Sequence, residues 1–199
     1  MDDDHVRRHY EPRIGPDRPS HEIADWADVA SQEARFGVLA DGVDLARRSL
    51  LDVGCGTGDL VAYLMGRGVA VDYLGVDLIE KMIVEARRRH PAAAFECVDP
   101  FQPGALAGRQ FDVVFASGVF NLDAGDNRED LPRRVGRLLE LSREALVFNL
   151  LHARETDRYE YCFYWDPTDV RAILDRFDCN WRIIDDYLPN DFTVIGRKP

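Results

Sequence analysis

The segment LLDVGCGTGDL, residues 50–60, decides how this sequence folds. It opens on the apolar run Leu50–Val53, which is typical of a short buried strand. Glycines at 54, 56 and 58 follow at once, and residues 57–67 then show a helical pattern. Glycine tolerates positive φ and carries no side chain, so a ligand can lie against such a turn and face the free N–H groups of the helix start. The segment predicts a strand, a glycine turn and a helix. A glycine turn without a ligand stays the alternative for the segment taken alone.

Two carboxylates narrow the kind of ligand. The glycine spacing is G-x-G-x-G, whereas a dinucleotide site usually shows G-x-G-x-x-G with a pyrophosphate at the helix start. Here Asp59 lies in the first helical turn, where it disfavours a phosphate. Asp77 ends the next predicted strand, 19 positions after Gly58, close to the offset of about 20 expected for an acid that binds ribose hydroxyls. Both features favour a nucleoside without phosphates.

Beyond residue 50, apolar runs alternate with helical patterns. Strands are expected over 50–53, 73–76, 93–98, 111–116, 145–151, 181–187 and 192–196, and helices over 57–67, 79–90, 128–141 and 168–177. This alternation predicts an α/β fold in which helices cover both faces of a mostly parallel, doubly wound sheet. Only residues 188–191 separate the last two strands, which should therefore pair antiparallel. In such a sheet the ligand lies beyond the carboxyl ends of the strands, where the strand order reverses.

The first 48 residues have a weaker pattern. Residues 1–19 are polar and rich in proline, and we expect an irregular arm there. Ser20 can cap a helix whose apolar face extends from Ile23 to Ala34, with Gly37 as its stop. A second short helix is expected over 38–47. We therefore divide the chain into an N-terminal arm and helical cap, 1–48, and one ligand-binding domain, 49–199.

Composition excludes several classes of function. The chain has 199 residues and a formal net charge of −11, which argues against nucleic acid and anionic membranes as partners. None of the four cysteines has C-x-x-C spacing and no histidine pair has metal-ligand spacing, so no metal is expected. Neither a signal peptide nor an apolar run of membrane-spanning length is evident. We expect a cytoplasmic protein; monomer and homodimer both stay open.

Four motifs, in order over residues 50–122, resemble those of the class I, Rossmann-like S-adenosylmethionine-dependent methyltransferases that act on small molecules. LLDVGCGTG at 50–58 resembles the family's first motif, and Val76-Asp77 its ribose-binding acid. Cys97-Val98-Asp99 and the run 111–117, FDVVFAS, resemble the motifs of the third and fourth strands. The resemblance implies a seven-stranded sheet of order 3-2-1-4-5-7-6 with an antiparallel last strand and an N-terminal helical cap.

The resemblance also implies roles for individual residues. Asp77 would bind the ribose hydroxyls, Asp99 the adenine amino group, and Arg35 the methionine carboxylate. The full set implied to bind the cofactor, whose product is S-adenosylhomocysteine, is Arg35, Asp52, Gly54, Cys55, Gly56, Gly58, Asp77, Leu78, Met82, Asp99, Pro100, Phe101, Ser117 and Gly118. A solvated charge on a surface helix stays the alternative for Arg35.

The methyl acceptor is less well defined. Transfer from a sulfonium mainly needs alignment and exclusion of water, but a hydroxyl or amine acceptor also needs a base. His152, just after the fifth strand, is the candidate catalytic base; an exposed loop histidine is the alternative. Candidate acceptor contacts are Asn121, Asn149, Tyr161, Tyr164 and Trp165, although the aromatic residues could also be a loop that covers the core. His5, His9 and His90 are expected on the surface.

The sequence favours transfer of a methyl group to an oxygen or nitrogen atom of a small molecule. The acidic charge and the absence of an N-P-P-Y or D-P-P-Y run after the fourth strand both favour such an acceptor. Two alternatives stay open: an enzyme of this fold that uses S-adenosylmethionine for other chemistry, and a non-catalytic regulator that binds the cofactor or its product.

Overall fold

One mixed β-sheet organises the molecule. The computed structural model describes residues 3–199. The strands are β1 (Ser49–Val53), β2 (Asp72–Asp77), β3 (Ala94–Cys97), β4 (Phe111–Ala116), β5 (Ser142–Leu151), β6 (Asn180–Ile184) and β7 (Asp191–Arg197). Their order is β3-β2-β1-β4-β5-β7-β6, and β7 is antiparallel to both of its neighbours. The predicted fold class, strand order and antiparallel last strand are confirmed.

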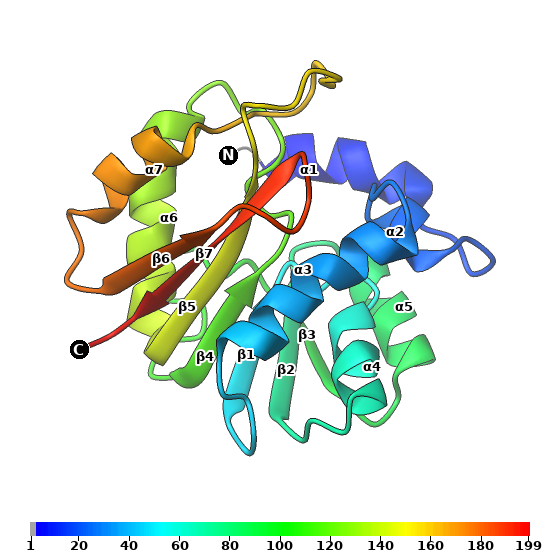
Figure 1. Ribbon diagram of the computed structural model, residues 1–199. Coiled ribbons are helices and arrows are strands. Elements are labelled where there is room, and N and C mark those ends of the chain that lie inside the picture. The colour runs from blue at the N-terminus through cyan, green and yellow to red at the C-terminus, as the bar shows by residue number, and fades with distance from the viewer. Residues whose placement is uncertain (1–2) are drawn as a thin grey trace.

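Helices cover both faces of the sheet, as Figure 1 shows. The covering helices are α3 (Val29–Gly42), α4 (Asp59–Gly66), α5 (Glu80–Arg89), α6 (Asn127–Leu141) and α7 (Pro167–Leu174). Successive side chains of a strand point to opposite faces, so Leu50 packs in the cluster with α3, α4 and α5, whereas Leu51 packs in the one with α6 and α7. Each strand of the centre is therefore buried on both sides, which explains its continuous apolar sequence.

The strand register brings the predicted site residues to one edge. Val53, the last residue of β1, lies opposite Val76 of β2 and Ala116 of β4. Asp77 lies opposite Cys97 at the end of β3. The segments that follow these four parallel strands therefore start side by side.

The N-terminal predictions were partly wrong. Residues 3–19 are not an irregular arm: α1 spans Asp3–Tyr10 and a 3-10 helix spans Glu11–Arg13; residues 1–2 lie outside the described part. The expected long helix is split into α2 (Ser20–Ile23) and α3. The split arises because Asp28 caps a new helix, its carboxylate accepting from the Ser31 N–H at 2.6 Å. No second helix starts at residue 38, since α3 continues to Gly42.

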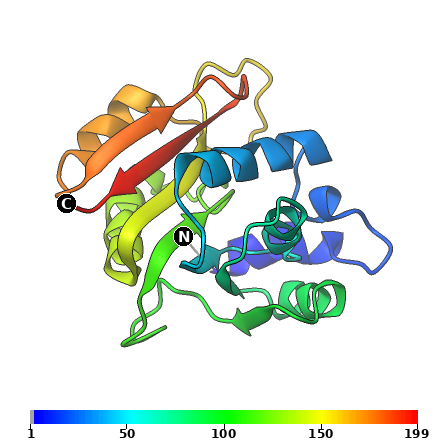
Figure 2. The same ribbon diagram turned by 60° about the horizontal axis from the view of Figure 1, so that its bottom comes forward.

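Long-range contacts attach this N-terminal segment to the start of α5. Arg7 Nη2 donates to the Leu78 carbonyl at 2.6 Å, and Lys81 pairs with Glu11 at 3.1 Å. Beneath them, Ile23 and Met82 belong to a small buried cluster. Figures 1 and 2 show the blue segment beside α5, over the edge where the parallel strands end. Within residues 3–199, no helix is long and apolar enough to cross a membrane.

Candidate cofactor-binding and acceptor site

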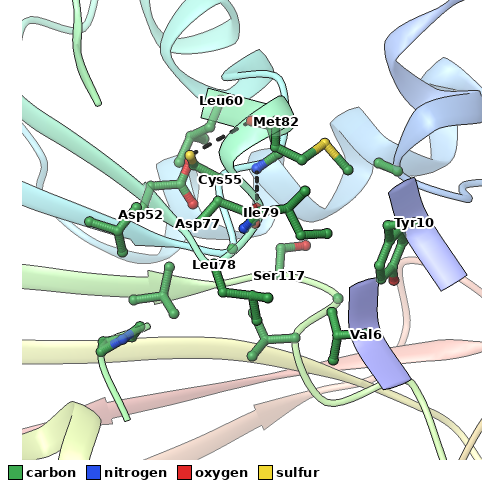
Figure 3. Close-up of a pocket in the computed structure, with 18 of the residues that line it drawn as sticks. Val6, Tyr10, Asp52, Cys55, Leu60, Asp77, Leu78, Ile79, Met82 and Ser117 are labelled. Atoms are coloured by element: carbon green, nitrogen blue, oxygen red, sulfur yellow. Dashed lines mark hydrogen bonds between the residues drawn. The ribbon is translucent and has the colours of Figure 1, made fainter. Parts of the chain in front are cut away.

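A cleft of about 1100 Å³, open mouth included, lies beyond the ends of β1, β2 and β4. Its floor consists of the segments that follow these strands, and its lid is the N-terminal segment. Figure 3 shows Val6 and Tyr10 on α1 across the cavity from Asp52 and Asp77. The cleft thus occupies the position that the strand order predicts for a ligand.

The glycine turn shapes the floor through its backbone. The N–H groups of Gly54 and Cys55 both donate to the Val76 carbonyl, at 2.8 and 3.0 Å. Gly54 has a φ of +69°, and a Cβ there would come within 2.7 Å of Val119. Both the backbone conformation and the space therefore require glycine. The turn leaves room for a ligand against the main chain.

Asp77 is held in place by backbone donors. Its Oδ2 accepts from the Gly56 N–H at 3.1 Å and its Oδ1 from the Ile79 N–H at 2.9 Å. Burial raises the pKa of Asp77 to about 6, although these N–H donors oppose the shift. An ionised carboxylate has further lone pairs to offer, so Asp77 can accept from two ligand hydroxyls and become easier to ionise as it does so.

Asp52 is the second buried carboxylate of the floor. Its Oδ2 accepts from the Tyr73 hydroxyl at 2.7 Å. Burial raises the pKa of Asp52 to about 7; the Tyr73 hydrogen bond opposes this shift, while the charges of Asp77 and Asp59 add to it. No cation accompanies it among the described side chains that line the cleft near β1. A buried carboxylate of this kind favours a positively charged ligand group.

The other charges of the cleft have partners. Asp59 accepts from Thr57 Oγ1 at 2.8 Å and from Gln32 of the lid at 3.3 Å. Asp99 accepts from the Phe101 N–H at 3.0 Å. Arg134 is bonded to Asp130 and lies 4.2 Å from the centre of the Phe101 ring. Four carboxylates and one guanidinium therefore line the described cleft, a balance that suits a cationic ligand.

Several lid residues outside the set implied to bind the cofactor also line the cleft. They are Val6, Tyr10, Ala24, Trp26, Gln32 and Phe36. Trp26 lies so close to Gly118 that a Cβ there would approach its ring to 3.0 Å. The apolar face from Ile23 to Ala34 contains Trp26, but an apolar helical face is also what a core helix shows. For Trp26 the sequence held no signal that would separate the two, whereas the segment 32–36 resembles a helix that closes over the cofactor in small-molecule methyltransferases.

Most of the residues implied to bind the cofactor line the cleft. They are Asp52, Gly54, Cys55, Gly56, Asp77, Leu78, Met82, Asp99, Pro100, Phe101, Ser117 and Gly118. Ser117 contributes a buried hydroxyl with no hydrogen-bond partner, as expected where a polar ligand completes the site. Gly58 does not line the cleft; it is the positive-φ residue before α4.

Arg35 also lies outside the cleft lining. Its Nε and Nη2 donate to Asp191 Oδ2 at 3.0 and 2.9 Å, and the two side chains are 2% and 0% exposed. Its guanidinium carbon lies 4.1 Å from the centre of the Trp26 ring. The structure thus gives Arg35 neither of its two expected environments, ligand contact or solvent: it joins α3 to β7 behind Trp26.

None of the six residues expected at the acceptor site lines the cleft. Asn149 accepts from the Gly118 N–H at 2.8 Å and donates to Asp191 at 2.7 Å, so it supports the floor from behind. Asn121 is buried, and its backbone carbonyl accepts from the Phe163 N–H. Trp165 is 1% exposed in the core. Tyr164 accepts from the Tyr159 N–H.

His152 is positioned by the hairpin side of the sheet. Its Nδ1 accepts from the Arg154 N–H at 3.1 Å, and its ring packs edge-on against Phe192. Asp185 lies 3.9 Å from its Nε2. Burial lowers the pKa of His152, with Arg154 adding to the effect. Its catalytic role stays a prediction, and no contact of the cleft supports it.

Among residues 3–199, no three His, Cys, Asp or Glu side chains gather as a metal site would require.

Comparison with known proteins shows what this chain is similar to. Residues 50–141 match a protein family described as "Methyltransferase domain". A Mycobacterium tuberculosis protein named as a methyltransferase is 29% identical over 160 residues, which cover 75% of this chain and 93% of the relative. The trans-aconitate 2-methyltransferase of Afipia carboxidovorans is 30% identical over 106 residues, 49% of this chain but only 40% of that enzyme.

Among solved structures, the magnesium protoporphyrin IX methyltransferase of Synechocystis PCC 6803 with bound S-adenosylhomocysteine has a TM-score of 0.72. It is 18% identical, and all of both chains is covered. The sheet order and the glycine turn at β1 define the Rossmann-like class of S-adenosylmethionine-binding proteins. Residues 50–141 carry the match to the methyltransferase domain, and the fold of the whole chain is that of the class I S-adenosylmethionine-dependent methyltransferases.

Proposed function

We propose that this protein transfers the methyl group of S-adenosylmethionine to a small molecule that enters beneath the N-terminal lid. The observation that carries the proposal is the pair of buried carboxylates, Asp52 and Asp77, at the ends of adjacent strands in one cleft. S-adenosylmethionine offers what each of them lacks: two ribose hydroxyls for Asp77, and cationic ammonium and sulfonium groups for the region of Asp52.

The remaining lining fits the same cofactor. Leu78 and Met82 provide the apolar surface on which an adenine can pack, with Asp99 near its amino group. The unpartnered Ser117 hydroxyl and the backbone at Gly118 are available to the methionine part. S-adenosylmethionine supplies the activated methyl group when bound. The protein holds the two reactants in line and keeps water out, and the lid residues Trp26 and Phe36 suit that second task.

A small acceptor is favoured by the shape and the charge of the site. The lid covers the cleft, which leaves space for a compact molecule but not for a folded macromolecule. The net charge of −11 disfavours nucleic acid. The acceptors in the names of the relatives, trans-aconitate and magnesium protoporphyrin IX, are small molecules too. We further propose that the enzyme works in a reducing compartment such as the cytoplasm, since all four cysteines are free.

Titration calorimetry with S-adenosylmethionine and S-adenosylhomocysteine tests the cofactor site. Asp77→Asn should weaken binding about 100-fold, because two hydrogen bonds to a charged acceptor contribute about 1.5 kcal/mol each or more. Asp72→Asn is the matched control, since Asp72 is the exposed first residue of the same strand. It should bind as the wild type does. Equal affinity of Asp77→Asn and wild type would refute the ribose assignment.

A screen for S-adenosylhomocysteine release then tests the acceptor. Candidate hydroxyl, amine and carboxylate compounds are incubated with the protein and S-adenosylmethionine, and product is measured by mass spectrometry. Release that depends on a small acceptor supports the proposal. Methylation of added protein or nucleic acid in place of small molecules would contradict it.

A further inference from the structure

A second group of polar side chains meets beside the lid residues that line the cleft, and nothing described so far uses it. His9 Nε2 lies 2.9 Å from Asp25 Oδ2. The Tyr161 hydroxyl donates to the same oxygen at 3.2 Å, and Arg13 lies 3.4 Å from Oδ1. The side chains of His9 and Asp25 are only 12% and 28% exposed. His9 was expected on the surface; the structure instead covers most of its side chain.

Three separate segments bring this group next to the lining of the cleft. Asp25 stands between Ala24 and Trp26, which both line the cavity. His9 precedes Tyr10, whose ring lies across the cavity from Asp77 and Leu78 in Figure 3. Tyr161 is tied to the floor because its carbonyl accepts from the Asp123 N–H at 2.8 Å, next to Leu122 of the lining.

The backbone at Asp25 is held in an unusual conformation. Its φ is +60°, a region that asparagine and aspartate enter more readily than other residues with a side chain. The turn that imposes it is closed by the Trp26 N–H, which donates to the His21 carbonyl at 2.7 Å. Such backbone conformations cluster at functional sites. Here the turn directs the carboxylate to His9 and places Trp26 in the lid.

The hydrogen bonds define which nitrogen of His9 is free. The His9 hydrogen bond is the largest of the effects that hold the pKa of Asp25 below its usual range, and Arg13 and Tyr161 add to it. Asp25 is therefore ionised and can only accept, so Nε2 of a neutral His9 carries the proton. Nδ1 is then the basic nitrogen.

We propose that His9 is the general base of the methyl transfer, oriented by Asp25, and that the acceptor is a hydroxyl or amine compound. The proposal rests on the proposed function. The acceptor's O–H or N–H proton passes to His9 Nδ1 as its oxygen or nitrogen bonds the methyl carbon. The carbon–sulfur bond breaks with its electron pair staying on sulfur. The products are methylated acceptor, neutral S-adenosylhomocysteine and an imidazolium that Asp25 stabilises.

The aromatic rings that pack on His9 indicate the character of this acceptor. Tyr10 packs edge-on against the imidazole, with ring centres 4.7 Å apart. Tyr161 lies 4.8 Å away on a tilted plane, and Tyr159 stacks on Tyr161. Aromatic walls favour a flat, largely apolar body. A carboxylate acceptor is already ionised at neutral pH and needs no base, so the His9–Asp25 pair distinguishes this site from one built for an acid.

A purely structural role for the pair must be separated from the catalytic one. His9 and Asp25 also join α1 to the turn before Trp26, and the titratable or charged groups around His9 are Tyr10, Arg13, Asp25, Tyr161 and Cys162. The decisive readout must therefore report proton transfer rather than folding. The ionisation state of a bound phenol does so.

The probe is 4-nitrophenol, whose ionised form absorbs visible light, titrated into the S-adenosylhomocysteine complex across a pH range. Wild type should bind the ionised form, because the proton moves to His9. In His9→Gln, which keeps a donor for Asp25, the apparent ionisation pH of the bound probe should rise by about 1 to 3 units. In Asp25→Asn, which tolerates the same backbone, the apparent ionisation pH of the bound probe should also rise, because the imidazolium loses the carboxylate that stabilises it.

His152→Gln is the matched control, and it should ionise the probe as wild type does. Calorimetry on each variant should give S-adenosylhomocysteine affinity within about twofold of wild type. No probe binding, or equal ionisation in wild type and His9→Gln, overturns this inference while leaving the cofactor site intact. Loss of probe ionisation in His152→Gln alone would return the role to His152. Failure of wild type to bind S-adenosylhomocysteine would instead overturn the proposed function itself.

Discussion

The floor and the lid of the cleft are built in different ways. The floor follows β1, β2 and β4 and depends on the backbone: Gly54, Gly56 and Ile79 place their N–H groups within a few residues of a strand end. The lid, residues 3–42, depends on side chains that reach far along the sequence. Arg7 contacts a carbonyl 71 positions away, and Arg35 a carboxylate 156 positions away.

This difference separates two tasks of the enzyme. A floor fixed by the ladder of a sheet holds its hydrogen-bonding groups in fixed positions. A lid attached through a few ion pairs and hydrogen bonds can differ in its contacts without disturbing the sheet. It is also the lid that places Trp26 in the lining of the cleft and the His9–Asp25 pair beside it. Changes in the two regions should accordingly have separable effects.

The largest expected effect comes from removing the buried cation of the lid. Arg35→Met leaves Asp191 buried without its guanidinium, which should cost about 3 to 5 kcal/mol of unfolding free energy. Urea denaturation followed by circular dichroism measures the loss. Because Arg35 also lies against Trp26, the variant should bind S-adenosylmethionine less tightly as well.

The double variant Arg35→Met/Asp191→Asn is the control. Removing both charges relieves the uncompensated carboxylate, so it should recover much of the lost stability. Asn149 and Tyr187 still find a polar partner at position 191. If the single and double variants were equally unstable, the ion pair would not be what holds α3 on β7.

This contrast also explains what the sequence could predict. The glycine turn and Asp77 lie at the ends of strands whose apolar runs are plain, and the resemblance to the methyltransferases supplied Asp99, so the residues of the floor could be predicted one by one. Arg35 was assigned to the cofactor because nothing in the sequence reveals Asp191 as its partner. His152 stands after the right strand, but β5 continues to Leu151 along the antiparallel β7, and its ring turns to Phe192 instead of the cleft. The importance of His9 depends on the turn at Asp25, which no local pattern announces.

A smaller effect, confined to the floor, is the pH dependence of cofactor binding. In the folded, cofactor-free protein the pKa of Asp52 is raised to about 7. Between the ordinary carboxyl pKa and pH 7, the folded protein therefore keeps a proton on Asp52 that the unfolded chain has already lost. This contribution to stability is present at low pH and is lost as the pH rises through about 7. A cationic cofactor favours the ionised form, so its affinity should increase up to about tenfold per pH unit between pH 5.5 and 7.5 for each proton released.

Calorimetry in buffers of different ionisation enthalpy counts the protons released on binding. Asp52→Asn should flatten the pH dependence of the affinity, whereas Asp72→Asn at the exposed end of β2 should leave it unchanged. Asp77, whose pKa is about 6, accounts for any slope that remains in Asp52→Asn below pH 6.5. Affinity that falls with rising pH in wild type would contradict the charge assigned to this part of the cleft.

The smallest expected effect tests the one local signal within the lid, the capping box of α3. Asp28 and Ser31 each satisfy a backbone N–H of the other, and Asp28→Ala should cost about 1 kcal/mol of unfolding free energy. Thermal melting measures it, with Asp28→Asn as the control that keeps an acceptor and loses little. α3 also carries Gln32 and Phe36 into the cleft. If bound S-adenosylmethionine holds the lid in place, the loss of melting temperature caused by Asp28→Ala should be smaller with the cofactor than without it. An unchanged shift would show instead that the helix start is independent of the cleft, which would place the boundary between lid and floor after Asp28.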